Sequence, residues 1–237
     1  MRHIPRIHVT ASLFKGGNIV TTSPERHHLL TVFRMQAGAE VHLFNAASGE
    51  WRARLIDKQK GIFLCTECLR PSASFFGPHL FFPILKGSRL ELLIEKSVEL
   101  GVGALHPIFT DHTDILFFNK ERWQVVVKQA TEQCGRLDLP PIHRPEKLSH
   151  ILDKWLLKDS LLVGDERQGA PSIIPFLDKI PPSAAFLVGP EGGFSAQEFA
   201  TFARLPFINC VSMGATTLRT ETAALAFLAL HAAFQNT

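Results

Sequence analysis

Length, composition and charge limit what this chain can be. Its 237 residues, 46% of them hydrophobic, can bury a large core, and at roughly 100 to 200 residues per domain we expect two domains. Residues 1–6 lack the apolar core of a signal peptide, and the longest apolar stretch, residues 223–234, falls short of the about 20 residues that span a membrane. We therefore expect a cytoplasmic protein that is neither secreted nor membrane-bound.

The N-terminal part carries most of the positive charge. Residues 1–72 contain ten Lys or Arg and five Asp or Glu, and the formal net charge of the whole chain is +3. Alternating segments at residues 39–44, 51–56 and 61–69 predict short strands of a small barrel or sheet. A basic β-domain suggests nucleic-acid binding, although any single arginine can also belong to an ordinary solvated surface. The candidate phosphate contacts are Arg6, Arg26, Arg34, Arg52 and Arg54.

A stretch with Pro, Ser and Gly at residues 71–78 predicts the domain boundary, which divides the chain into residues 1–72 and 73–237. Beyond it, strand-like and helix-like segments alternate, as expected for an α/β domain with a mainly parallel sheet. The expected strands are residues 80–85, 104–109, 160–163, 184–188 and 208–213, and the expected helices are residues 88–100, 121–134 and 223–234. The last helix is apolar on every side, so we expect it to be buried all round, against its own domain and a second subunit.

Cys65 and Cys68 form a C-x-x-C motif that can hold zinc in other proteins. Here the motif lies in a strand-like run, where positions three apart face opposite ways, and Cys134 and Cys210 supply no second close pair. We expect reduced thiols and no metal site.

Two glycine-bearing loops near the C-terminus are the most informative motifs. Residues 187–195 follow one predicted buried strand, residues 213–222 follow the next, and each loop precedes a predicted helix. Ser195 and Glu198 form a capping box, which starts the helix that follows the first loop. Because open α/β sheets bind ligands at the carboxyl ends of their strands, the two loops predict a ligand pocket.

The charge of the first loop limits its ligand. Glu191 lies within the loop, and neither a Gly-Lys-Ser/Thr ending nor Gly-x-Gly-x-x-Gly spacing is present, which disfavours a nucleotide phosphate. A ligand with hydroxyls, a flat base and a positive centre fits better, and S-adenosylmethionine (SAM) has those parts. The residues that we expect to contact it are Leu187, Val188, Gly189, Pro190, Glu191, Gly192, Gly193, Met213, Gly214 and Leu218.

These motifs resemble those of a known family, the ribosomal RNA small subunit methyltransferase E family of knotted SPOUT methyltransferases. The similar stretches occur in the family's order, at residues 5–6, 27–35, 86–87 with 95–102, 132–136, 189–193 and 218–223. Some positions differ: Ala215 and Thr216 stand where the family usually has a proline or similar residue and then an arginine, and residues 43–51 and 110–113 also depart from the pattern.

The resemblance implies a fold and a reaction. It implies a PUA-like RNA-binding β-barrel over residues 1–72 and a SPOUT-type α/β domain over residues 73–237, with a trefoil knot and a homodimer interface that includes residues 223–234. It also implies SAM-dependent methylation of N3 of a uridine in small-subunit ribosomal RNA, which we expect within the assembled subunit. N3 lies on the Watson–Crick edge, so the target base must be unpaired or flipped out of its stack.

A cation near the uracil carbonyl oxygens would stabilise the negative charge that develops as N3 loses its proton. Arg219 is the first candidate for this role and Arg136 the second, with ion pairing inside the loop as the structural alternative for Arg219. Glu221 is a candidate proton acceptor, and Thr220 is expected to cap the last helix.

Three other functions are also compatible with the sequence. One is another SPOUT reaction, such as ribose 2′-O-methylation of ribosomal or transfer RNA. Another is a non-catalytic RNA-binding protein that assists ribosome assembly. The third, a nucleotide-dependent oxidoreductase, is disfavoured by the missing dinucleotide fingerprint.

Overall fold

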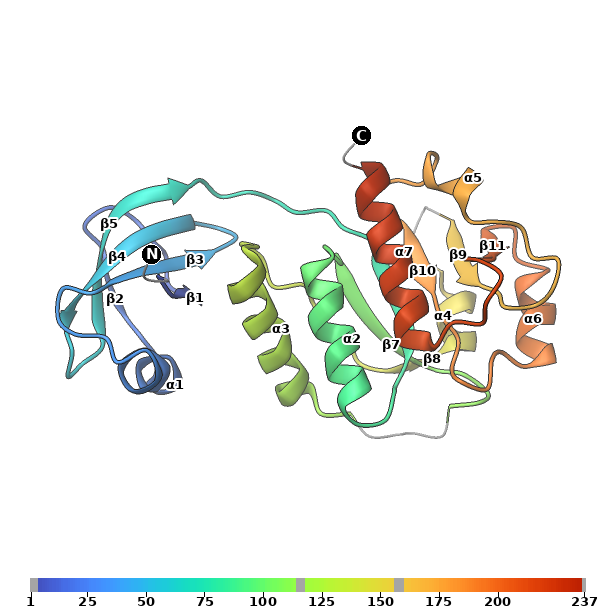
Figure 1. Cartoon of the computed structure of the whole chain (residues 1–237), viewed down its shortest axis with the longest axis horizontal. Coiled ribbons are helices and arrows are strands. Elements are labelled where there is room, and N and C mark those ends of the chain that lie inside the picture. The colour runs from blue at the N-terminus through green and yellow to red at the C-terminus, as the bar shows by residue number, and fades with distance from the viewer. Residues whose placement is uncertain (1–3, 114–117, 156–159, 236–237) are drawn as a thin grey trace. The chain divides into compact units, whose positions relative to one another are not determined.

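The computed structural model of the protein describes residues 4–113, 118–155 and 160–235 (Figure 1). It divides into two compact units. The N-terminal unit comprises Met1–Phe75 and Thr131–Leu139, and the C-terminal unit comprises Phe76–Ala130 and Pro140–Thr237. The last turn of the helix Lys120–Cys134 therefore belongs to the N-terminal unit, and the rest of that helix belongs to the C-terminal unit.

The N-terminal unit is built on a five-stranded sheet with the order β1-β3-β4-β5-β2. Its strands are β1 (Arg6–His8), β2 (Asn18–Val20), β3 (Glu40–Asn45), β4 (Gly49–Asp57) and β5 (Ile62–Arg70). A short helix α1 (Ser23–His27) continues into a π-helical turn, His28–Val32. The core of the N-terminal unit includes the inward-facing side chains of Leu43, Ala53, Leu55 and Phe63. The three predicted strands are thus confirmed, whereas β1 and β2, with three residues each, are too short to show an alternating pattern.

The pairing of β5 does not follow the simple alternation expected for the C-x-x-C motif. Cys65 pairs with Ala53 and Cys68 with Trp51 of β4, and a register shift lies between these pairs, so the prediction that positions three apart face opposite ways is wrong here. Cys65 is buried and Cys68 is exposed. Burial raises the pKa of the Cys65 thiol, so this group stays protonated and packs as a small apolar side chain.

The C-terminal unit holds a six-stranded sheet, in the order β11-β9-β10-β6-β7-β8, in which every pair is parallel. Its strands are β6 (His79–Pro83), β7 (Ala104–Phe109), β8 (Glu146–Lys147), β9 (Leu161–Gly164), β10 (Ala185–Leu187) and β11 (Ile208–Val211). The helices are α2 (Ser88–Glu99), α3 (Lys120–Cys134), α4 (Leu148–Asp153), α5 (Ile174–Leu177), α6 (Ala196–Phe202) and α7 (Thr220–Gln235). The expected parallel α/β sheet is confirmed.

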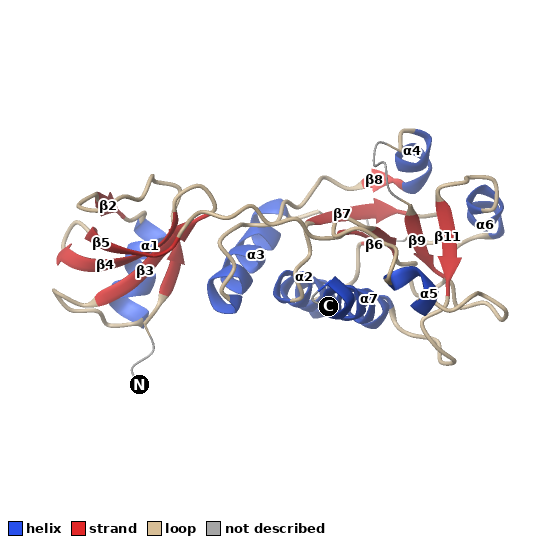
Figure 2. Ribbon diagram, turned by 90° about the horizontal axis from the view of Figure 1, so that it is seen from above, coloured by secondary structure: helices blue, strands red, loops and turns tan. Residues whose placement is uncertain are grey.

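Helices cover both faces of this sheet, which is why its central strands are mostly apolar, whereas the edge strand β8 is charged and exposed. Figure 2 shows α2 and α7 together on one face, with α4 on the other. On the α4 face, Leu148 and Leu152 of α4 and Phe202 of α6 join one cluster with strand residues such as Val163 and Leu187. Among the described residues no helix is long and apolar enough to cross a membrane.

The last helix, α7, is buried on one side only within this chain. Phe227 is fully buried and stacks on Phe186 of β10 with ring centroids 4.0 Å apart. Ala229 and Ala233 are exposed, and Leu230 is half-buried. We expected α7 to be buried all round, but within this chain only the side that faces the sheet is buried. A helix that packs on a sheet presents only one of its sides to that sheet.

Candidate functional site

Three loops enclose a pocket at the carboxyl edge of the parallel sheet. They follow the neighbouring strands β9, β10 and β11, whose ends are in register: Leu187 pairs with Val163, and Val211 with Gly164. The pocket has a volume of about 400 Å³, which is within the range of small-molecule sites. Its lining comes from residues 164–166, 188–191, 193–194 and 211–220, together with Phe199 and Ala223.

Most of the residues expected to contact the cofactor line this pocket. These are Val188, Gly189, Pro190, Glu191, Gly193, Met213, Gly214 and Leu218. Two others are not among the lining residues. Leu187 is fully buried in β10, and Gly192 lies against the ring of His112, whose Nδ1 is 3.1 Å from the Gly192 oxygen.

The first loop needs its glycines for steric reasons. A Cβ on Gly189 would lie 3.0 Å from the Phe194 ring. Gly193 has φ +68°, and a Cβ there would lie 3.1 Å from Glu166 Oε1. After the glycines, the Ser195 hydroxyl accepts a hydrogen bond from the Glu198 backbone N–H, and the Glu198 carboxylate accepts one from Ser195 N–H. The capping box predicted at the start of α6 is confirmed.

A hydrogen bond joins the first loop to the second. Thr220 Oγ1 donates to the Gly189 carbonyl oxygen at 2.7 Å, and Thr220 is 4% exposed. The prediction that Thr220 caps α7 is wrong, since Thr220 is the first residue of that helix. The first hydrogen bond of α7 runs from the Ala223 N–H to the carbonyl oxygen of Arg219, at 2.8 Å, so Arg219 precedes the helix. Thr220 is thus used to hold two loops together.

Two arginines flank Glu191 at the mouth of the pocket. Arg89, from the first turn of α2, forms an ion pair with the Glu191 carboxylate, and Arg219 Nη1 lies 3.5 Å from the same oxygen. The hydrogen bond from Arg89, aided by the charges of Arg89, Arg219 and Lys86, lowers the pKa of Glu191. The Arg219 side chain is 69% exposed, so it reaches beyond the loop into solvent.

The other two candidate catalytic residues are placed differently. Glu221 is 8% exposed, and its Oε2 has no hydrogen-bond partner among the described residues. Arg136 belongs to the N-terminal unit, where it pairs with Asp138 at 2.7 Å and lies over the Phe75 ring at 4.3 Å. Neither Glu221 nor Arg136 lines the pocket, whereas Arg219 does.

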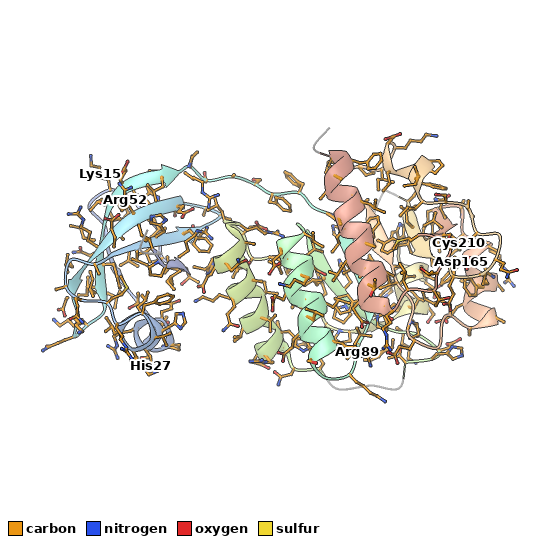
Figure 3. All side chains as sticks on the ribbon, viewed as in Figure 1. Lys15, His27, Arg52, Arg89, Asp165 and Cys210 are labelled. Atoms are coloured by element: carbon orange, nitrogen blue, oxygen red, sulfur yellow. The ribbon has the colours of Figure 1, made fainter. Side chains whose placement is uncertain are left out.

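A third loop, after β9, was missed in the sequence. It carries Asp165, which pairs with Arg167 at 2.7 Å, and the Arg167 guanidinium lies 3.4 Å from the centroid of Phe199. Burial alone would raise the pKa of Asp165, but hydrogen bonds and charge from Arg167 outweigh it and lower that pKa. Figure 3 shows Asp165 beside Cys210, whose thiol pKa is raised by burial and by Asp165. The signal that could have found this loop is the Gly-Asp pair directly after the apolar run of β9.

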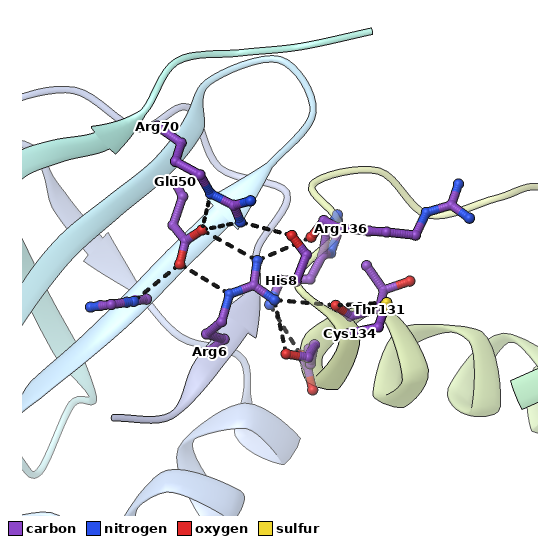
Figure 4. Close-up of polar contacts among 10 residues, drawn as sticks. Arg6, His8, Glu50, Arg70, Thr131, Cys134 and Arg136 are labelled. Carbon is purple, nitrogen blue, oxygen red and sulfur yellow. Dashed lines mark hydrogen bonds and ion pairs between the residues drawn. The ribbon is translucent and has the colours of Figure 1, made fainter. Parts of the chain in front are cut away.

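The five N-terminal arginines have unequal surroundings. Arg6 Nε binds Glu50 at 3.0 Å, and its other nitrogens donate to the backbone oxygens of Thr131, Glu132 and Arg136 (Figure 4). Burial alone would raise the pKa of Glu50, but hydrogen bonds from Arg6 and Arg70 outweigh it and lower that pKa. Arg6 therefore ties the sheet to the end of α3 within the N-terminal unit.

Arg52 Nε lies 2.7 Å from Glu40, and its Nη1 also pairs with Glu67. By contrast, Arg34 and Arg54 are exposed, and within the described residues neither has an ion pair. Arg26 is half-buried and donates only a long bond, 3.4 Å, to the Gln59 oxygen.

Comparisons with known proteins agree with this architecture. Residues 76–232 match the family model of the RNA methyltransferase domain, and residues 21–68 match that of the RNA methyltransferase PUA domain. A PUA domain joined to a parallel α/β sheet with a loop pocket at its carboxyl edge defines the class, the RNA methyltransferases.

Among curated relatives, ribosomal RNA small subunit methyltransferase E of Synechocystis sp. is 31% identical over 89% of this chain and 71% of the relative. The protein of the same name from Rickettsia conorii is 29% identical over 94% of this chain and 93% of its own. The chain therefore belongs to the ribosomal RNA small subunit methyltransferase E family.

Two solved structures agree with this fold over nearly the whole chain. That of ribosomal RNA small subunit methyltransferase E from Neisseria gonorrhoeae, bound to SAM, has a TM-score of 0.82 and 26% identity, and covers 96% of each chain. A methyltransferase from Legionella pneumophila, solved in complex with SAM, has a TM-score of 0.87 and 27% identity over 98% of each chain.

Proposed function

We propose that this protein transfers a methyl group from SAM to N3 of a uridine in 16S ribosomal RNA, as the name of its family implies. The observation that carries the proposal is the three-loop pocket, built from the segments that match the methyltransferase domain. Relatives of this family have been solved with SAM bound.

The residues present suit that cofactor. Val188, Met213 and Leu218 offer apolar contact to a flat base, while Asp165 and Glu191 offer carboxylates to hydroxyls and to a positive centre. Gly189 and Gly193 both line the pocket, and the missing side chain at each lets the Phe194 ring and Glu166 pack against the loop. When bound, SAM supplies an electrophilic methyl group on a sulfonium.

The protein's own residues then have three tasks: to orient the uracil, to exclude water and to accept the N3 proton. We propose that the exposed Arg219 contacts the uracil carbonyl oxygens and stabilises their developing negative charge. The N3 proton passes to a carboxylate, for which Glu221, with a free Oε2 among the described residues, and Glu191 are the candidates. Arg136 is not part of this proposal, because Asp138 and Phe75 already hold its guanidinium.

We also propose the assembly that the family resemblance implies. The part-exposed apolar side of α7, with Leu225, Leu230 and Phe234 half-buried, supports a homodimer through this helix. The order of the strands supports a knotted C-terminal segment, since β9 lies between β10 and β11, which follow it in sequence. We assign residues 1–72 to RNA binding and residues 73–237 to catalysis, in a cytoplasmic enzyme that acts on the assembled small subunit.

The test is transfer of labelled methyl from SAM to small ribosomal subunits that lack the modification, with naked 16S RNA and transfer RNA in parallel. We expect 3-methyluridine in the small-subunit RNA, identified by mass spectrometry of nucleosides, and greater labelling of subunits than of naked RNA. Label on a ribose, or in transfer RNA, would contradict the proposed reaction. Binding of RNA with no transfer to any substrate would show a non-catalytic protein.

A further inference from the structure

The N-terminal unit has an exposed basic surface around Phe33. It is formed by residues 26–36, which run through the end of α1 and the π-helical turn, and by residues 58–60, which connect β4 to β5. Two contacts join the segments: Arg26 Nη1 to the Gln59 oxygen at 3.4 Å, and Lys58 Nζ to Gln36 Oε1 at 3.1 Å. We call this surface the Phe33 patch.

Positive charge dominates the Phe33 patch. It carries Arg26, Arg34, Lys58 and Lys60, together with His27 and His28. Within the described residues, none of these four Lys and Arg side chains has an ion pair with a carboxylate. Elsewhere in the same unit Arg6, Arg52 and Arg70 all pair with glutamates. In Figure 3, His27 lies on the opposite side of the unit from Arg52 and Lys15.

An aromatic side chain lies within this basic surface. Phe33 is 38% exposed, and the His28 ring contacts it edge to face, with centroids 5.0 Å apart and planes at 84°. Its neighbour Val32 is 61% exposed. The next residue, Arg34, has φ 52°, which places this exposed cation directly after the ring at a turn of the chain.

Exposed cations around an exposed aromatic ring fit one class of partner, single-stranded RNA. Cations that are not neutralised by carboxylates attract phosphates, and an unpaired base of any identity can stack on the ring. A double helix cannot use Phe33 in this way, because its bases are already stacked on one another. We propose that the Phe33 patch binds an unpaired stretch of RNA, with one base stacked on Phe33 and adjacent phosphates on Arg34 and Lys58.

This inference rests on the proposed function for the identity of the RNA, and a binding experiment separates the two. The full-length protein is titrated into a fluorescein-labelled single-stranded 12-nucleotide RNA, and into the same RNA annealed to its complement. Phe33→Leu keeps an apolar side chain and removes the stacking surface, so we expect single-strand affinity to fall about fivefold or more with duplex affinity unchanged. Phe33→Trp should retain the affinity.

Phe14→Leu is the matched control, since Phe14 is a 59% exposed phenylalanine of the same unit outside the patch. Arg34→Asn removes the charge with a residue that tolerates positive φ, and should weaken the binding of both RNAs and make it less dependent on salt. Cross-linking of a 4-thiouridine RNA should label the peptide that contains Phe33.

Equal loss of single-strand affinity in Phe33→Leu and Phe14→Leu, or an unchanged affinity in Phe33→Leu, would overturn the inference. The methyl-transfer assay on the same proteins keeps the proposed function separate. If the wild type transfers methyl groups and Phe33→Leu binds single-stranded RNA as well as the wild type does, only the role of the Phe33 patch is refuted. If Phe33→Leu weakens RNA binding but the wild type transfers no methyl group, only the proposed reaction is refuted.

Discussion

The hydroxyl of Thr220 donates a hydrogen bond to the carbonyl oxygen of Gly189 across 2.7 Å. The bond joins the first residue of α7 to the loop that follows β10, so it fixes two of the three walls of the pocket against each other. Both residues also line the pocket. Since the bond is partly buried and Thr220 is only 4% exposed, its loss should change the shape of the site as well as the stability.

Thr220→Val tests this bond with a side chain of nearly the same shape. The Gly189 oxygen would lose its donor, and we expect a stability loss of about 1 to 3 kcal/mol together with weaker SAM binding. Isothermal titration with SAM and urea denaturation measure the two effects. Thr201→Val is the control, because Thr201 makes a similar side-chain bond to the Gln197 oxygen on the exposed surface of α6. Equal SAM affinities for the two variants would refute the role of Thr220.

Arg219→Ala should abolish transfer while leaving SAM binding nearly intact. Arg219 is highly exposed and only 3.5 Å from Glu191, and Glu191 keeps its ion pair with Arg89 when Arg219 is removed. Loss of a cation that stabilises the transition state commonly lowers kcat about 100-fold to 1000-fold. Single-turnover transfer and equilibrium SAM binding, measured on the same variant, check the split. An unchanged transfer rate would remove Arg219 from the mechanism, and a matching loss of SAM affinity would show that it orders the loop instead.

Gly193→Ala should weaken SAM binding through the backbone of the first loop. An alanine at φ +68° costs about 1 kcal/mol or more, and its Cβ would meet Glu166 Oε1 at 3.1 Å. Gly16→Ala is the matched control: Gly16 has φ +81° in the N-terminal unit, with no atom within 4 Å of a Cβ. Both variants should lose stability, but only Gly193→Ala should lose SAM affinity. If the Gly16 variant lost SAM affinity equally, the effect would come from general destabilisation.

Much of the C-terminal unit could be predicted because its elements carry strong local signals. The apolar run of residues 104–109 is β7 to the residue, and the Ser195–Glu198 capping box starts α6 as expected. The two glycine loops could be placed at strand ends by the same reasoning. The sequence could not show that β9 lies between β10 and β11, because strand order depends on contacts between distant segments.

The N-terminal unit was harder to predict, and for a different physical reason. The arginines at residues 6 and 34 look equivalent in a sequence, yet one is held by Glu50 and by backbone oxygens near the end of α3, while the other is exposed. That difference comes from residues 131–139 folding with a sheet far away in the chain. Composition shows only that the unit is basic, and the tertiary contacts decide which cations are available.

A stack of three histidines in the C-terminal unit predicts a pH dependence of stability. His106 of β7 lies flat between Phe81 and His143, each with ring centroids 4.3 Å away, and its Nε2 is 2.9 Å from His79 Nδ1. Burial, with added repulsion from His143 and His79, lowers the pKa of His106 to about 3 from the ordinary 6.5. His106 is therefore neutral in the folded protein throughout the physiological range.

Because the folded-state pKa is lowered, the unfolded chain takes up a proton below pH 6.5 that the folded chain excludes. His106 thus costs stability as the pH falls from 6.5 towards 3, by up to about 1.4 kcal/mol per pH unit. His106→Phe keeps a flat ring in the stack and removes the titrating group. As the pH falls from 6.5 to 4, the free energy of unfolding of the variant should therefore decrease less than that of the wild type. Urea denaturation at pH 7, 6, 5 and 4 measures the difference, with the exposed His150→Gln as control. Parallel profiles for wild type and His106→Phe would show that protonation of His106 is not linked to unfolding.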